Sequence, residues 1–110
     1  MIVTNSFSLN MIEREKKGVQ IKADPITLSQ AREIAGLGAE SAVGHADTAK
    51  IFSSLLGVEI PAERKTLSIK NGSVLVGQYT GPRLPEGATE LPEGAEINWW
   101  IVEIRQGGES

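Results

Sequence analysis

The sequence predicts a small single-domain α/β protein, with a mixed sheet of about five strands and two main helices. Runs of β-forming residues stand at the start, middle and end of the chain, and two helical patterns lie between them. The order strand, helix, helix, hairpin, strand places the helices mostly on one face of the sheet. With 110 residues, of which 40% are hydrophobic, the chain can bury one core. We expect residues 1–106 to form this domain and residues 107–110 to form a flexible tail.

The first strand is expected at Ile2–Leu9, a run rich in β-forming residues. Polar side chains gather in its second half at Asn5, Ser6 and Ser8. Short hydroxyl and amide groups at a strand end either make a structural turn or donate to phosphate and ribose oxygens. Both interpretations of these residues are open from the sequence.

A second, shorter strand is expected at Val19–Ala23, where apolar and polar residues alternate. The charged segment Met11–Lys17 before it is expected to form a helical turn or an exposed connection. Asp24-Pro25 is expected to end the second strand, because proline and aspartate are both typical of turns.

The first helix is expected over Leu28–Ala35. Thr27 and Gln30 have the spacing of a capping box at its start, and Gly36 and Gly38 stop it. Its inward face is expected to carry Leu28, Ala31, Ile34 and Ala35.

The second helix lies within Ser41–Gly57, after a short extended link at Glu40–Val43. Gly57 stands where a helix commonly ends in a left-handed glycine. His45, the one histidine of the chain, stands at the start of this helix, where unpaired backbone N–H groups favour an anion. The inward face is expected to hold Ala49, Phe52 and Leu56, and the outward face Asp47, Lys50 and Ser54.

A β-hairpin is expected next, because Asn71-Gly72 stands between the β-rich runs Thr66–Lys70 and Ser73–Tyr79. Thr80–Glu93 follows as a loop rich in proline and glycine, with two LPEG repeats. The last strand is expected at Ile97–Arg105. Its adjacent tryptophans, Trp99 and Trp100, must point to opposite faces of the strand, so one of them needs additional cover. We therefore expect a homodimer.

Composition excludes several classes of function. The formal net charge is −3, which argues against binding duplex nucleic acid through a basic surface. The absence of cysteine excludes disulfides and thiolate metal sites, and one histidine disfavours a transition-metal site, so no metal or other cofactor is expected. No apolar run reaches the roughly 18–20 residues that span a bilayer, so we expect no membrane partner and a cytoplasmic location.

The remaining inventory of polar residues is compatible with RNA phosphodiester cleavage. In that reaction the ribose 2′-OH of the substrate is the nucleophile. The protein must align this group, stabilise charge on the phosphoryl oxygens and protonate the leaving 5′-oxygen. Arginines such as Arg64 and Arg83 suit the oxygens, and His45 suits the acid role. His45 is equally compatible with a plain surface position near a helix end.

Three segments together resemble the viral ring nucleases, the type III anti-CRISPR family, which also has bacterial and prophage members. They are MIVTNSFSLNMI at the N-terminus, SAVGHADTAKIFSSLLG in the middle and GPRLPEG before residue 88. The resemblance implies a homodimer that binds cyclic tetra-adenylate, the second messenger of type III CRISPR defence, in the host cytoplasm. It also implies cleavage without metal to linear oligoadenylates that end in a 2′,3′-cyclic phosphate, which switches the defence off.

The resemblance also assigns site residues. It implies that His45 is the general acid, that Arg83 binds ligand or stabilises the transition state, and that Glu86 orients groups or assists proton transfer. The implied ligand contacts are Asn5, Ser8, Arg64, Gln78 and Arg83. After RLPEG, however, this chain carries Pro92 and Gly94 where family members usually continue into an acidic helix. The alternatives are a non-catalytic protein that sequesters or senses a cyclic oligonucleotide, and a small interaction protein.

Overall fold

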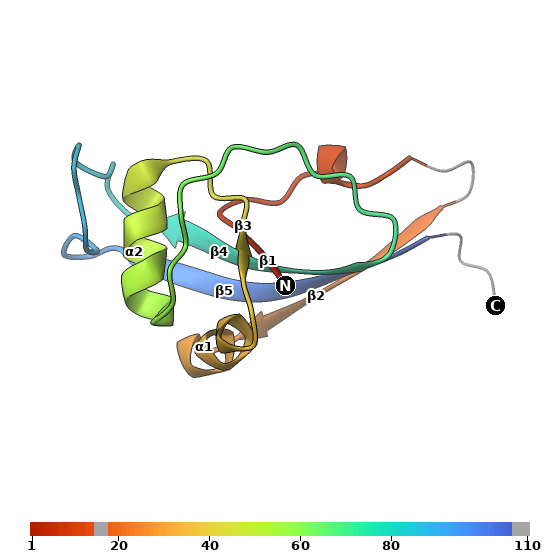
Figure 1. Ribbon diagram of the computed structural model, residues 1–110, viewed down its shortest axis with the longest axis horizontal. Coiled ribbons are helices and arrows are strands. Elements are labelled where there is room, and N and C mark those ends of the chain that lie inside the picture. The colour runs from red at the N-terminus through yellow and green to blue at the C-terminus, as the bar shows by residue number, and fades with distance from the viewer. Residues whose placement is uncertain (15–17, 107–110) are drawn as a thin grey trace.

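The computed structural model describes residues 1–14 and 18–106. The predicted fold class is confirmed: one five-stranded mixed sheet, in the order β2-β5-β4-β1-β3, carries two α-helices (Figure 1). The elements are β1 (Ile2–Thr4), the 3-10 helix η1 (Leu9–Met11), β2 (Val19–Ile26), α1 (Leu28–Gly36), β3 (Glu40–Ser41), α2 (Ala46–Leu56), β4 (Gly72–Thr80) and β5 (Glu96–Gln106). In the described ranges no helix is long and apolar enough to cross a bilayer.

Strand pairing divides the sheet into a parallel and an antiparallel half. β1 lies between β3 and β4 and runs parallel to both, with Val3 opposite Ser41 and Leu75. β5 lies between β4 and β2 and runs antiparallel to both. The three parallel strands, β1, β3 and β4, therefore end at the same edge of the sheet. The candidate site lies at this edge.

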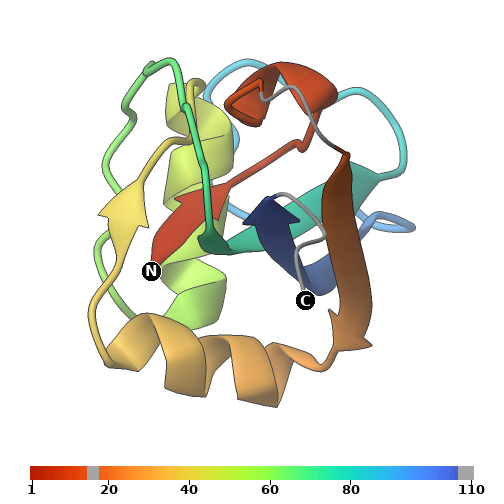
Figure 2. The ribbon, with the colours of Figure 1, turned by 90° about the vertical axis from the view of Figure 1, so that its right-hand side faces the viewer.

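Both α-helices cover the same face of the sheet, as predicted (Figures 1 and 2). The capping box at the start of α1 is confirmed: the Gln30 N–H donates to Thr27 Oγ1 (3.1 Å), and the Thr27 N–H donates to Gln30 Oε1 (2.9 Å). Gly57 ends α2 with φ 74°, in the left-handed region that favours glycine. The buried core of this face consists of Val3, Ala31, Ala35, Val43, Ala49, Phe52, Leu56, Ile60, Leu75 and Trp99.

Gly77 of β4 is required where α2 meets the sheet. It pairs with Trp99 of β5, and the rings of Trp99 and Phe52 pack over it with their centroids 4.9 Å apart. A Cβ atom at residue 77 would lie 2.6 Å from Trp99 Cζ3 and 2.7 Å from Phe52 Cζ. These distances are well inside van der Waals contact, so only glycine lets both aromatic rings approach the strand.

The other face of the sheet carries a second core, and neither α1 nor α2 lies on it (Figure 2). As predicted, Trp100 lies on this face, opposite to Trp99. The segments around Ile12 and Ile69 form a parallel bridge and pack against the core. The buried members are Ile12, Val74, Val76, Val102 and Ile104.

The predicted hairpin before β4 is wrong. Thr66–Lys70 is not a strand paired with β4, because β1 and β5 already occupy both edges of β4. The segment pairs instead with the stretch after η1: the Ile69 N–H donates to Met11 O (2.8 Å), and the Glu13 N–H donates to Ile69 O (2.9 Å). The hairpin that does form joins β4 to β5 through the 81–95 loop.

Two predicted strand boundaries are also wrong. β1 ends at Thr4 rather than Leu9, since Thr4 Oγ1 donates to Ser6 O (3.0 Å) and accepts from Ser6 N–H (3.4 Å), which turns the chain. β2 continues through Asp24 and Pro25 to Ile26. It is an edge strand with a partner on one side only, where a proline costs least. Residues 15–17 of the expected connection and the expected tail at 107–110 lie outside the described residues.

Candidate functional site

The candidate site lies at the edge where the three parallel strands end. Asn5 follows β1, Gly44 and His45 follow β3, and Gln78 stands near the end of β4. The Ala42 N–H donates to Val3 O (2.8 Å), which carries the β1–β3 pairing towards this edge. The carboxyl edge of parallel strands is the usual place for ligand sites in open α/β sheets.

His45 is the residue from which α2 starts. Its backbone is extended (φ −119°, ψ 129°), its carbonyl accepts from the Ala49 N–H (2.9 Å), and its side chain makes no capping hydrogen bond. The imidazole is exposed and therefore accessible to a ligand at the N-terminal end of the helix. The unpaired N–H groups of this helix end favour an anionic ligand beside the imidazole.

The loop after β4 brings Arg83 and Glu86 to the same helix end. One shallow hollow is lined by His45, Tyr79 and Arg83, together with Asp47, Thr48, Gly81 and Leu84. A second hollow is lined by Asp47, Arg83, Leu84, Pro85 and Glu86. The two hollows share Asp47, Arg83 and Leu84, so they adjoin. The structure thus brings together the three residues that the family resemblance assigned to catalysis.

The 81–87 part of the 81–95 loop, which carries Arg83 and Glu86, is held on both sides. At its start, the Tyr79 hydroxyl donates to Pro82 O, and Gly81 (φ 148°) is packed so tightly that an added Cβ atom would lie 2.8 Å from Ala95 Cα. At its end, the Gly87 N–H donates to Asp47 Oδ2 in the first turn of α2 (3.1 Å). The side chains between these anchors include Arg83 and Glu86, both exposed.

Arg64 lies beside the histidine segment. The Glu63 N–H donates to Val43 O (2.8 Å), which ties this part of the chain to the residue before Gly44. A Cβ atom built on Gly44 would lie 3.7 Å from Arg64 Nε, so the guanidinium group packs along the backbone that precedes His45. The neighbouring Lys65 is engaged elsewhere, since its Nζ donates to Glu40 Oε2 (2.8 Å).

Two of the expected ligand contacts, Gln78 and Ser8, lie apart from the histidine. Gln78 alternates with Gly77 and Tyr79 along β4, so its side chain points to the face opposite to α2. Asn5 is half-buried just after β1. Ser8 precedes η1, which lies away from α2 and the 81–95 loop (Figure 1). The structure therefore gathers His45, Arg83, Glu86 and Arg64 in one region, and it does not place Gln78 and Ser8 there.

Two residues of the site are not predicted from the sequence. The helical pattern predicts only that Asp47 faces outward, and the β-rich run predicts only that Tyr79 lies in a strand. Asp47 is two residues after His45, and Tyr79 is two residues after Gly77, so alternation along β4 would have placed it on the α2 face. The contact between Asp47 and Gly87 joins distant parts of the chain, and no local pattern predicts it.

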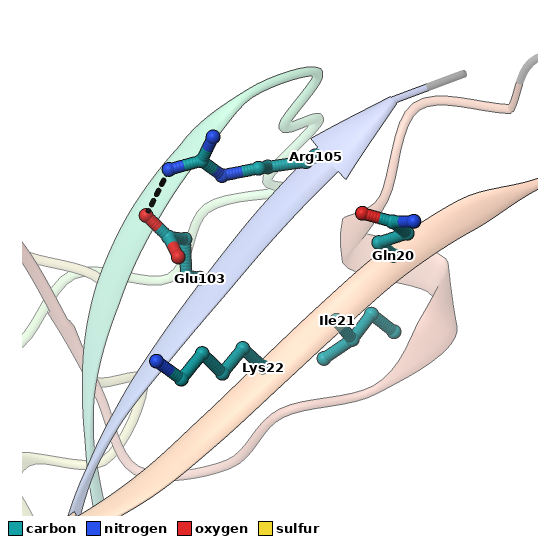
Figure 3. Close-up of a pocket in the computed structure, with 5 residues that line it drawn as sticks. All are labelled: Gln20, Ile21, Lys22, Glu103 and Arg105. Atoms are coloured by element: carbon teal, nitrogen blue, oxygen red, sulfur yellow. Dashed lines mark hydrogen bonds and ion pairs between the residues drawn. The ribbon is translucent and has the colours of Figure 1, made fainter. Parts of the chain in front are cut away.

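Another hollow lies at the far end of β2 and β5, lined by Gln20, Ile21, Lys22, Glu103 and Arg105 (Figure 3). Its charges compensate one another: Arg105 donates to Glu103 (3.0 Å), and Lys22 lies 3.9 Å from Asp24. It contains none of the residues expected to do chemistry. Across residues 1–14 and 18–106, no group of three or more His, Cys, Asp or Glu residues could hold a metal ion.

Comparison with known proteins places the chain in a viral context. Residues 1–100 match the family model described as STIV B116-like. "Uncharacterized protein 26" of Sulfolobus islandicus filamentous virus is 32% identical over 111 residues, which cover 94% of this chain and 91% of that protein. Among solved structures, B116 of Sulfolobus turreted icosahedral virus matches with a TM-score of 0.74 and 22% identity, over 92% of this chain and 96% of that one.

The structural match shows the shared fold, and the matched family model and the viral relative extend over nearly the whole chain. The names of these proteins state no activity. The chain belongs to the STIV B116-like family, a viral protein family.

Proposed function

We propose that this protein is a metal-independent ring nuclease that binds cyclic tetra-adenylate across a homodimer and cleaves it. The single observation that carries the proposal is the gathering of His45, Arg83 and Glu86 at the N-terminal end of α2. The resemblance of the sequence to the ring nucleases supplies the ligand, and the viral family fits a protein that disarms a host defence in the host cytoplasm.

The proposed reaction is a transesterification within the substrate. The ribose 2′-oxygen attacks the adjacent phosphorus, and its proton passes to Glu86 or to solvent. The bond from phosphorus to the 5′-oxygen breaks, and His45 protonates the leaving oxygen. Arg83 stabilises the charge on the non-bridging oxygens. The products are linear oligoadenylates with a 2′,3′-cyclic phosphate and a free 5′-hydroxyl, so no water molecule or oxidant is consumed.

A dimer explains how an acidic chain holds a polyanion. A cyclic tetranucleotide has four phosphates, and a two-fold axis presents Arg64 and Arg83 twice to one ligand. The shallow hollows beside His45 are open to solvent, which suits a ring that lies across the sheet edge more than one enclosed in a monomer. A ligand of this size can also extend over the strand ends towards Asn5 and Gln78.

The test is a single-turnover assay with labelled cyclic tetra-adenylate in the presence of EDTA. General acid catalysis contributes roughly 10²–10⁴-fold, so His45→Ala is expected to slow cleavage at least about 100-fold while the Kd changes little. Lys50→Ala is the control, because Lys50 is exposed on the same helix and lines neither hollow. Cyclic tri- and hexa-adenylate define the ring size.

The outcomes separate the candidate functions. Unchanged cleavage by His45→Ala contradicts the mechanism. Tight binding by the natural sequence without linear product favours a sequestering or sensing protein. If the ring neither raises the melting temperature nor is cleaved, the protein does not recognise this ligand.

A further inference from the structure

We propose that Asp47 is a positioning residue, which latches the end of the 81–87 loop to the first turn of α2 and so sets Arg83 and Glu86 relative to His45. The effect on cleavage rests on the proposed function, whereas the latch itself does not. The contact is the hydrogen bond from the Gly87 N–H to Asp47 Oδ2 (3.1 Å). Asp47 lines both hollows of the candidate site, and it lies two residues after His45 on one helical turn.

A duplicated turn shows what Asp47 contributes. The sequence Leu-Pro-Glu-Gly-Ala occurs at 84–88 and again at 91–95. Both copies form the same turn: the Ala88 N–H donates to Pro85 O and the Ala95 N–H to Pro92 O, each at 3.1 Å. Their glycines have φ 82° and 83°. The turn therefore forms from its own sequence, with no requirement for the carboxylate.

The first copy alone has its glycine N–H bound to a carboxylate among the described hydrogen bonds. Asp47 thus fixes where this turn sits, while the turn sequence fixes its shape. The other end of the loop is already anchored to β4, through Tyr79 and Pro82. Removing Asp47 leaves the 81–95 loop attached through its two strands and the Tyr79–Pro82 contact, while the part that carries Arg83 and Glu86 loses the hydrogen bond that ties it to α2.

The charge of Asp47 distinguishes positioning from ligand binding. A carboxylate in the first turn of α2 opposes an incoming polyanion, so it gains nothing as a ligand contact. Removing it is expected to leave the affinity for cyclic tetra-adenylate equal or higher. Cleavage is expected to slow at least about threefold, the factor by which one net hydrogen bond shifts an equilibrium. Asp47→Asn keeps an oxygen acceptor for the Gly87 N–H and is expected to restore most of the rate lost in Asp47→Ala.

Digestion with trypsin tests the latch independently of nuclease activity. The Arg83–Leu84 bond lies in the loop and is exposed, so its cleavage measures how often the loop opens. Asp47→Ala is expected to raise the rate of trypsin cleavage at this bond at least about threefold. Asp47→Asn is expected to be cleaved there at nearly the rate of the natural sequence. Glu93→Gln in the second copy of the turn is the matched control. The Arg32–Glu33 bond within α1 reports general unfolding in the same digest.

An unchanged rate of cut at Arg83–Leu84 in Asp47→Ala overturns the latch, whatever the nuclease assay gives. A faster cut at both bonds also overturns it, because it shows general unfolding. A faster cut at Arg83–Leu84 alone, with ring cleavage unaffected, overturns the positioning role. If the natural sequence cleaves no ring, the proposed function fails, and the trypsin digest still decides the latch.

Discussion

Gly77→Ala places one methyl group where two aromatic rings meet, and its effect can be estimated from the structure. The new Cβ atom would lie 2.6 Å from Trp99 Cζ3 and 2.7 Å from Phe52 Cζ. Carbon atoms attract best at about 3.5–4.0 Å, so each ring must retreat by about 1 Å. Phe52 has no exposed surface and Trp99 is 4% exposed, so neither ring has free space to move into.

Overpacking of this kind costs typically about 1–3 kcal/mol, and the double contact places Gly77→Ala in the upper half of that range. Unfolding entropy is about 2.1 cal/mol/K per residue, or about 0.23 kcal/mol/K for this chain of 110 residues. A loss of about 2–3 kcal/mol therefore corresponds to a melting temperature lowered by about 9–13 °C.

Thermal unfolding followed by circular dichroism measures this shift. Gly36→Ala is the matched control, since Gly36 ends α1 and an added Cβ atom there has no neighbour within 4 Å. Alanine is favoured over glycine in a helix by about 1 kcal/mol, so the control is expected to melt at the same temperature or higher. A Gly77→Ala protein that melts within about 2 °C of the natural sequence refutes the packing argument.

Two further predictions concern the first helix and the pair that joins β3 to the 57–71 segment. Thr27→Ala removes the acceptor of the Gln30 N–H and is expected to lower the free energy of unfolding by about 1 kcal/mol. Thr27→Ser keeps a hydroxyl acceptor and is expected to be nearly as stable as the natural sequence. Equal midpoints of urea unfolding for all three proteins would contradict this. The hydrogen bond and charge of Lys65 hold the pKa of the Glu40 carboxyl below its ordinary value. A carboxyl with a lowered pKa contributes stability above its unfolded pKa and loses it as the pH falls through the folded pKa. Glu40→Gln is therefore expected to melt slightly lower than the natural sequence at pH 7 and equally at pH 3, and a difference that persists in acid counts against the pair.

Local signals in the sequence predicted the fold well. The capping box at Thr27 and the glycine at the end of α2 depend on residues that are close in sequence, and both are confirmed. The opposite faces of Trp99 and Trp100 follow from strand geometry alone. The hairpin at Asn71-Gly72 failed because strand pairing depends on which partners occupy the edges of β4, and those partners come from distant segments.

The candidate site was less predictable from the residues themselves. The assignment of Arg83 and Glu86 to the same site as His45 came from the family resemblance, and the structure places all three around adjoining hollows. Asp47 was missed because its importance depends on Gly87, which reaches it only through the course of the 81–87 loop. A long-range hydrogen bond of this kind leaves no periodic pattern in a sequence.

The strand order also has a consequence for how the chain acquires its structure. In β2-β5-β4-β1-β3, only β4 and β5 pair with a strand that follows directly in the chain. β1 pairs with the distant β4, where Ile2 lies opposite Val74, and β2 pairs with the distant β5, where Val19 lies opposite Gln106. Proteins whose contacts are this distant in sequence fold slowly, because loops must close before the contacts stabilise them. On the ribosome, the amphipathic helices α1 and α2 emerge long before β4 and β5 provide the sheet that buries them, so folding is completed only after the last strand is synthesised.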